Sequence, residues 1–353
     1  MTVPIYILSG FLGSGKTTLL QQMLENWKAE GKTPAVVMNE IGDVNLDGMM
    51  LGEDVAMAEL LSGCICCSNR ADLGMELYNL IQTGEPDVIV IEASGVANPV
   101  EILDAVTEIS LYHRMELRNL ITVVDAAHLW ELYEQQQGKT YRLMQEQIRA
   151  ASVLIVNKSD LLESERLEKV EQIARGWNPY APMYVTVRCE LDRYLYEQAG
   201  HALAGEHHVT AAEGNASIAE EQVHSAHHDQ NEQLHRKHDH QHHEDHHTHT
   251  HAPHHSHEHV MVYTHYFEQP INSEAFEALI ANLPTEVYRA KGILTFNDTN
   301  SRFLFQYAYR QSDFMKITPQ KPVPDVAVFI GEHFDKRHIQ ELLLTLERQE
   351  HEA

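Results

Sequence analysis

The chain has 353 residues, enough for two domains, and 43% of them are hydrophobic, enough for ordinary cores. Its formal net charge of −26 argues against nucleic-acid binding and against a basic membrane contact, because both depend on clustered lysine and arginine. No stretch reaches the ~18 apolar residues of a membrane span, and the N-terminus has no secretion signal, so we expect a cytoplasmic protein.

Apolar strand-like runs alternate with amphipathic helical stretches over residues 1–199. Such apolar strands suit a parallel sheet that is covered on both faces, and the alternation predicts a doubly wound α/β domain with a mostly parallel sheet. The expected strands are residues 3–8, 34–38, 87–91, 120–124, 152–156 and 183–187. The expected helices are residues 16–29, 71–83, 99–107, 126–137, 140–150 and 163–176.

The first motif reads G-F-L-G-S-G-K-T over residues 10–17, between a predicted strand and a predicted helix, and matches a phosphate loop (P-loop). Its backbone N–H groups are expected to surround nucleotide phosphates. Lys16 is expected to reach the β- and γ-phosphates as a catalytic residue, and the Thr17 hydroxyl to bind Mg²⁺. A chance glycine-rich turn is the alternative, which the flanking strand and helix disfavour. The predicted nucleotide contacts are Gly10, Gly13, Ser14, Gly15, Lys16, Thr17 and Thr18.

An acidic loop over residues 39–47 occupies the place of a nucleotide-sensing loop. Glu40 and Asp43 are its catalytic candidates, and Asp47 is a third acidic side chain in the same loop. These carboxylates are candidates for orienting the hydrolytic water, for completing a metal site, or for both. A polar surface loop is the alternative.

Three of the four cysteines, Cys64, Cys66 and Cys67, lie within four residues, and Cys189 is far away in the sequence. Thiolates are soft ligands that favour Zn²⁺ and Cu⁺. A closed structural zinc site needs four protein ligands, so this triplet predicts an open metal site that suits an ion that must leave. A redox pair and simple packing of small side chains are the alternatives.

The predicted strand at 87–91 ends in Glu92, and Gly95 follows three residues later. An acid at this point of a nucleotide-binding fold is expected to hold Mg²⁺, directly or through water. The Gly95 N–H is expected to meet the γ-phosphate. The alternative for Glu92 is a surface carboxylate at a strand end.

The sequence N-K-S-D over residues 157–160 follows another apolar strand. The Asp160 carboxylate can accept hydrogen bonds from guanine N1 and N2, which adenine cannot supply, and the Lys158 stem can lie across the base. Asn157, Lys158 and Asp160 therefore predict a preference for GTP.

Residues 200–259 are rich in His, Asp, Glu and Gln, with few large apolar side chains, so we expect a disordered linker. Neutral imidazole binds Zn²⁺, Ni²⁺, Co²⁺ and Cu²⁺, so weak, exchangeable metal sites are expected there. An inert solvated linker is the alternative. The candidate ligands are His238, His240, His242, His243, His246, His247, His249 and His251.

Residues 260–347 predict a small α+β C-terminal domain, followed by a tail over residues 348–353. The expected strands are residues 260–267, 287–296, 302–309 and 326–330, and the expected helices are residues 273–282 and 336–347.

These motifs, in this order, resemble the CobW-type metal-handling GTPases, which are related to the GTPases that insert nickel into hydrogenase and urease. The sequence R-A-K-G over residues 289–292 is similar to the motif of that family's C-terminal domain. The resemblance covers nearly the whole chain and implies GTP and Mg²⁺ at the P-loop and Glu92, guanine at residues 157–160, and metal at the cysteines. Some members carry additional glutamates near the Asn-Glu pair, where this chain has Met38 and Asp43. This departure weakens a glutamate-built metal site and leaves the thiolate site intact.

The function that follows is a GTP-hydrolysing metallochaperone that delivers zinc, or alternatively Co²⁺ or Ni²⁺, to client apo-metalloproteins. The cysteines lie in sequence between the two segments expected to sense the γ-phosphate, so GTP and GDP are expected to hold the thiolates differently. One alternative is a zinc storage protein whose GTPase regulates homo-oligomer formation. Another is a cobalt-insertion factor for corrinoid synthesis or for a metallohydrolase.

Overall fold

The structure is a computed structural model of the chain. It describes residues 2–38, 55–59, 70–135, 138–192, 197, 259–299, 301–308 and 310–349. The described residues before 200 and after 258 belong to one compact unit. Within the described ranges, no helix combines the length and the apolar character that crossing a membrane requires. The predicted linker at 200–259 lies outside the described residues except for His259.

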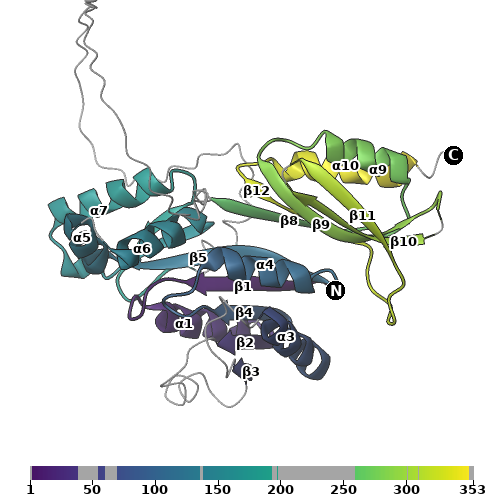
Figure 1. Cartoon of the computed structure of the whole chain (residues 1–353). Helices are drawn as coiled ribbons and strands as arrows, with labels where there is room; N and C mark the ends of the chain where they lie inside the picture. The colour runs from purple at the N-terminus through teal and green to yellow at the C-terminus, as the bar shows by residue number, and fades with distance from the viewer. Residues whose placement is uncertain are drawn as a thin grey trace, which may run out of the picture. The chain divides into compact units, whose positions relative to one another are not determined.

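A parallel sheet forms the centre of the N-terminal domain (Figure 1). Its strands are β1 (Val3–Ser9), β2 (Pro34–Met38), β3 (Ala56–Glu59), β4 (Val88–Glu92), β5 (Met115–Asp125), β6 (Val153–Asn157) and β7 (Met183–Val185). Their order in the sheet is β3-β2-β4-β1-β5-β6-β7, and each described pair of neighbours is parallel. The predicted doubly wound sheet is confirmed.

In β1, β2, β4, β5 and β6, alternate residues pack into two different cores. Ile5 and Ile7 of β1 share a core with α3, α4, α5, α6 and α7, whereas Tyr6 and Leu8 share the other core with α1. The helices are α1 (Lys16–Ala29), α3 (Arg70–Gly84), α4 (Pro99–Ile109), α5 (Ala126–Gln135), α6 (Lys139–Ala150) and α7 (Ser164–Trp177), with the short 3₁₀ helix η1 (Ser159–Leu161). Burial on both faces explains why the strands are almost continuously apolar.

The topology fixes where a ligand can bind. The chain runs outward from β1 to β2 and β3, returns to β4 between β2 and β1, and then continues on the other side of β1 with β5 and β6. Ligands of such sheets bind beyond the carboxyl ends of the strands at this reversal. The carboxyl ends of β1, β4, β5 and β6 therefore bring the phosphate loop, Glu92, Asp125 and Asn157 to one edge.

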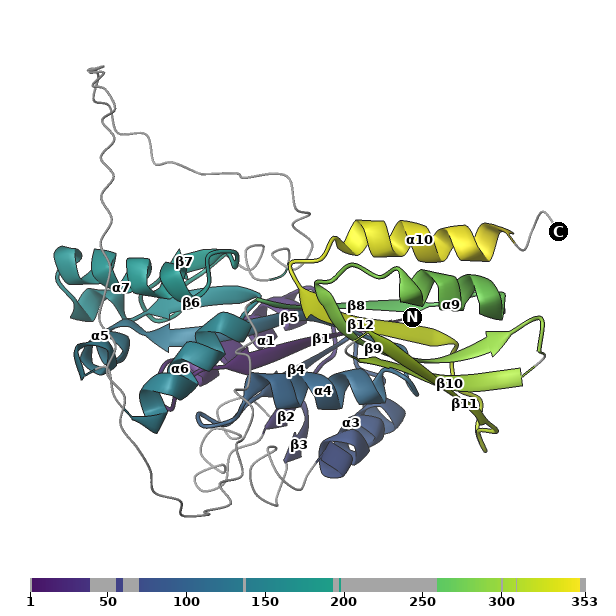
Figure 2. The same cartoon turned by 45° about the horizontal axis from the view of Figure 1, so that its top comes forward.

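The C-terminal domain has an antiparallel sheet with two helices on one face (Figure 2). Its elements are β8 (Val260–Tyr266), α9 (Ser273–Ala281), β9 (Val287–Phe296), β10 (Ser301–Ala308), β11 (Gln311–Ile317), β12 (Val326–Glu332) and α10 (Lys336–Gln349). The strand order is β11-β10-β9-β12-β8. Phe276 of α9 and Leu343 of α10 pack with Phe305 and Phe329 in one aromatic-rich core. The predicted small α+β domain is confirmed, with β11 as an additional strand.

Candidate functional site

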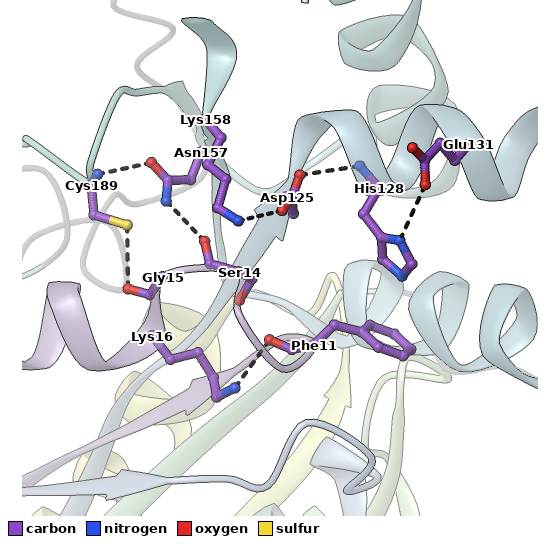
Figure 3. Close-up of polar contacts among 10 residues, drawn as sticks. All are labelled: Phe11, Ser14, Gly15, Lys16, Asp125, His128, Glu131, Asn157, Lys158 and Cys189. Carbon is purple, nitrogen blue, oxygen red and sulfur yellow. Dashed lines mark hydrogen bonds and ion pairs between the residues drawn. The ribbon is translucent and has the colours of Figure 1, made fainter. Parts of the chain in front are cut away.

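The phosphate loop connects β1 to α1, and the lysine of the loop, Lys16, donates hydrogen bonds back to the loop's own backbone (Figure 3). The Lys16 ammonium donates hydrogen bonds to the carbonyl oxygens of Gly10 (3.0 Å) and Phe11 (3.2 Å), and its side chain is 4% exposed. Phosphate oxygens are stronger, charge-assisted acceptors for an ammonium than carbonyl oxygens. Lys16 can therefore exchange these contacts for a nucleotide phosphate within the same loop.

Buried hydroxyl groups surround the loop. Among the residues that the structure describes, Ser9 and Ser14 each bury a side-chain oxygen with no hydrogen-bond partner, and so does Ser94 in the loop after β4. Buried polar atoms almost always have a partner in native proteins. Three such hydroxyls around the loop fit a site that binds a polar ligand.

Thr17 and Glu92 meet at the carboxyl edge of the sheet. The Thr17 hydroxyl donates a hydrogen bond of 3.1 Å to Glu92 Oε1, and Glu92 is 3% exposed. A hydroxyl and a carboxylate at this spacing are hard oxygen donors of the kind that Mg²⁺ prefers. The donor set therefore fits a magnesium ion that is shared with nucleotide phosphates.

Two glycines permit the close approaches in this site. Gly15 has a φ of 114°, and a Cβ atom there would lie 2.4 Å from Asn157 Nδ2. A Cβ on Gly95 would lie 2.5 Å from the backbone nitrogen of Leu12. The loop after β4 therefore packs directly on the phosphate loop, which only glycine allows at this distance.

Asn157 links three segments at the end of β6 (Figure 3). Its side-chain amide donates to the Ser14 carbonyl (2.8 Å), and its Oδ1 atom accepts hydrogen bonds from the Thr186 hydroxyl (3.2 Å) and the Cys189 N–H (2.8 Å). Asn157 is 2% exposed. A buried amide with these partners fixes the predicted base-binding segment against the phosphate loop.

Lys158 forms an ion pair that orients its stem. Its ammonium lies 2.6 Å from Asp125 Oδ2, at the end of β5, and Asp125 also accepts a hydrogen bond from the His128 N–H (3.1 Å) (Figure 3). Lys158 has a left-handed φ of 59°. Asp160 is exposed within η1. Its carboxylate is therefore accessible to the guanine base of a nucleotide that binds from solvent.

Cys189 is distant from the phosphate loop in sequence but touches it in the fold. The thiol donates a hydrogen bond of 3.4 Å to the Gly15 carbonyl, and the side chain is buried. Burial raises the pKa of the Cys189 thiol to about 12. The group therefore stays a neutral thiol at physiological pH, unlike a metal-binding thiolate.

Several predicted residues lie outside the described residues. These are the three acidic candidates Glu40, Asp43 and Asp47, the three cysteines Cys64, Cys66 and Cys67, and the histidines of the linker from His238 to His251. Among the residues that are described, no group of three or more His, Cys, Asp or Glu side chains is arranged to hold a metal ion.

The R-A-K-G sequence lies on β9 and contacts α4. Arg289 Nη1 donates to both carboxylate oxygens of Asp104 at 2.7 Å, and Lys291 Nζ donates to Glu108 Oε2 at 3.0 Å. Lys291 is 5% exposed, and burial lowers the pKa of its ammonium. These charged residues therefore attach the C-terminal sheet to the helix that follows Glu92 and Gly95.

Three groups of residues at this edge of the sheet have little or no signal of their role in the sequence. Asp125 follows an apolar strand as an isolated acid, the same signal that identified Glu92. Residues 186–189 carry no recognisable pattern, because their role depends on backbone position beside Asn157. The Gln147 amide donates to the Gly95 carbonyl (3.2 Å), but Gln147 lies in the amphipathic helix α6, where no local signal distinguishes it from a surface glutamine.

Two family models match the chain. Residues 4–185 match the model described as CobW/HypB/UreG, nucleotide-binding domain. Residues 260–347 match the model described as Cobalamin synthesis protein cobW C-terminal domain.

Curated proteins with similar sequences cover about half of the chain. The zinc-regulated GTPase metalloprotein activator 1 of Dictyostelium discoideum is 32% identical over 213 residues, which cover 51% of this chain and 44% of that protein. The zinc chaperone CobW of Pseudomonas aeruginosa is 33% identical over 207 residues, which cover 51% of this chain and 55% of that protein. The chain thus spans about half the length of the curated relatives that it matches.

Among solved structures, the chain is similar to the Zn(II)-bound YjiA GTPase from E. coli, with 22% identity and a TM-score of 0.43. That match covers 98% of this chain and 99% of the other chain.

Proposed function

The chain belongs to the CobW/HypB/UreG family, and we propose that it is a Mg²⁺-dependent GTPase that binds zinc and transfers it to client proteins under nucleotide control. The observation that carries the proposal is the hydrogen bond between Thr17 and Glu92. This contact joins the phosphate loop to the strand end that precedes Gly95, where the presence of a terminal phosphate can be sensed.

Nucleotide binding uses residues from four strand ends. Lys16 and the loop N–H groups bind the β- and γ-phosphates. Thr17 and Glu92 would hold Mg²⁺, which would supply positive charge to the phosphates when bound. Asp160 accepts the guanine N–H groups while the Lys158 stem, oriented by Asp125, covers the base. The remaining P-loop contacts come from Gly10, Gly13, Ser14, Gly15 and Thr18, with Gly95 at the γ-phosphate and Asn157 supporting the base site.

Zinc is the transported substrate, and Cys64, Cys66 and Cys67 are its ligands in the proposal. Two curated relatives are named as a zinc chaperone and a zinc-regulated metalloprotein activator, and thiolates are zinc ligands in proteins. Three ligands leave one position of the zinc ion open for a ligand from the client protein.

Glu40 or Asp43 orients the hydrolytic water in the proposal. The linker histidines bind metal weakly and so collect it. We place the protein in the reducing cytoplasm, where the cysteines stay unoxidised.

A transfer assay tests this function. The purified full-length chain is loaded with one equivalent of Zn²⁺ and mixed with a zinc-free, zinc-dependent enzyme in the presence of Mg²⁺ and either GTP or GDP. We expect the acceptor to gain activity about tenfold faster with GTP, the size of a typical coupling between two sites. Zinc buffered to the same free concentration without the chain is the control. Equal rates with GTP, with GDP and with buffered zinc would contradict the proposal.

A further inference from the structure

Gln147 is a polar side chain inside the apolar core beneath the loop after β4. It lies on α6 and is 1% exposed. Its side-chain amide donates to the carbonyl oxygens of Gly95 (3.2 Å) and Ala97 (3.4 Å). The backbone carbonyl of Gln147 accepts a hydrogen bond from the Thr122 hydroxyl of β5 (2.9 Å). Since both partners of the amide are carbonyl groups, the NH₂ end must face them.

The loop that Gln147 holds connects two functional elements. A backbone hydrogen bond from Ala97 to Ser94 (3.0 Å) closes a turn, and Asn98 then caps α4 through a hydrogen bond from the Val100 N–H (3.0 Å). On its other side, the turn packs through Gly95 against the backbone of Leu12 in the phosphate loop. This turn therefore connects the phosphate loop directly to the start of α4.

Glycine makes this turn easy to deform. A glycine backbone reaches more conformations than any other residue, so rotating the peptide plane after Gly95 costs little by itself. The two hydrogen bonds from Gln147 oppose that rotation. Each buried carbonyl that lost its donor would remain unsatisfied in an apolar core, which makes the alternative orientation unfavourable.

We propose that Gln147 is a positioning residue for γ-phosphate recognition: its amide holds the Gly95 and Ala97 carbonyls and thereby fixes the turn, closed by the Ala97–Ser94 hydrogen bond, that would present the Gly95 N–H to the γ-phosphate. This inference rests on the proposed function, because it assumes that the chain binds guanine nucleotides. Gln147 itself does not touch the nucleotide. Its contribution is selective for the nucleotide that carries a terminal phosphate.

The test compares two variants of the full-length chain with a matched control. Gln147→Glu keeps the shape and removes the NH₂ donor, and Gln147→Met keeps the length without polar atoms. The control is Asn178→Asp, because the Asn178 amide is also fully buried and donates to the carbonyls of Ile148 and Ala151, at the same end of α6 but without contact to the loop after β4. The readouts are thermal stability and the dissociation constants of GDP and of a non-hydrolysable GTP analogue, with Mg²⁺.

We expect both Gln147 variants to weaken binding of the GTP analogue about tenfold, while GDP affinity stays within about twofold, given the usual strength of buried hydrogen bonds. Asn178→Asp is expected to lower thermal stability and leave the ratio of the two affinities unchanged. The inference is overturned if the Gln147 variants lose stability as the control does but keep the wild-type ratio. A wild-type chain that does not distinguish the two nucleotides overturns it as well. A wild-type chain that binds no guanine nucleotide overturns the proposed function itself.

Discussion

Replacing Asp160 with asparagine should change the base that the protein accepts. Guanine donates from N1 and N2 to the carboxylate, and each hydrogen bond to a charged acceptor contributes about 1.5–3 kcal/mol. The kcat/KM for GTP should therefore fall by about 10²–10⁴-fold. Xanthine carries an oxygen at C2, which can accept a hydrogen bond from the asparagine amide. Turnover of xanthosine triphosphate should therefore rise in the same variant.

The measurement is steady-state hydrolysis of GTP and of xanthosine triphosphate by the wild type and by Asp160→Asn. Glu163→Gln is the matched control, because Glu163 is an exposed carboxylate three residues away that forms no side-chain cap on α7. The control should keep the wild-type preference for GTP. If Asp160→Asn keeps that preference too, Asp160 does not read the base.

Replacing Cys64, Cys66 and Cys67 together with serine should abolish tight zinc binding. A neutral hydroxyl replaces a soft thiolate at each ligand position, so we expect zinc affinity to fall by about 10³-fold or more. Hydrolysis of GTP with Mg²⁺ and without zinc should change little, because Lys16, Thr17 and Glu92 remain in place. Competition with a chromophoric zinc chelator measures the zinc affinity, and phosphate release measures the rate of GTP hydrolysis.

Cys189→Ser is the control for the cysteine experiment. Cys189 is a buried neutral thiol beside Gly15, so its replacement should leave zinc affinity unchanged, although nucleotide affinity can shift. Zinc affinity that survives in the triple variant and falls in Cys189→Ser would contradict our assignment of the metal site.

Many helices and strands of the fold are predicted by local patterns of apolar residues and turn residues in the sequence. The helix at 16–29 and the strand at 34–38 agree with the structure at both ends, because a glycine-rich turn and a buried apolar run mark their limits. The edge strand β11 was missed because most of its side chains are exposed, so backbone pairing with β10 stabilises it rather than a hydrophobic pattern. β3 was missed because it is a strand of four residues.

The candidate site could be predicted where a motif is contiguous, and less well where it depends on packing. Lys16, Thr17 and Glu92 could be paired in advance, since the first two belong to one motif and the third ends a strand. The contact of Gln147 could not be predicted from the sequence, because it depends on how α6 packs against the loop after β4. Cys189 was judged remote because sequence distance says nothing about the contact that the sheet creates with Gly15.

In the proposed function, the terminal phosphate of GTP changes how tightly the cysteines hold zinc. Moving a site from about 99% to about 1% loaded requires about 5.5 kcal/mol of differential binding, and a smaller difference still favours transfer. The most direct measurement is the zinc dissociation constant of the full-length chain, determined by chelator competition with saturating Mg²⁺ and either a non-hydrolysable GTP analogue or GDP. We predict constants that differ by at least about tenfold, or about 1.4 kcal/mol. Equal constants in the two nucleotide complexes would contradict the claim.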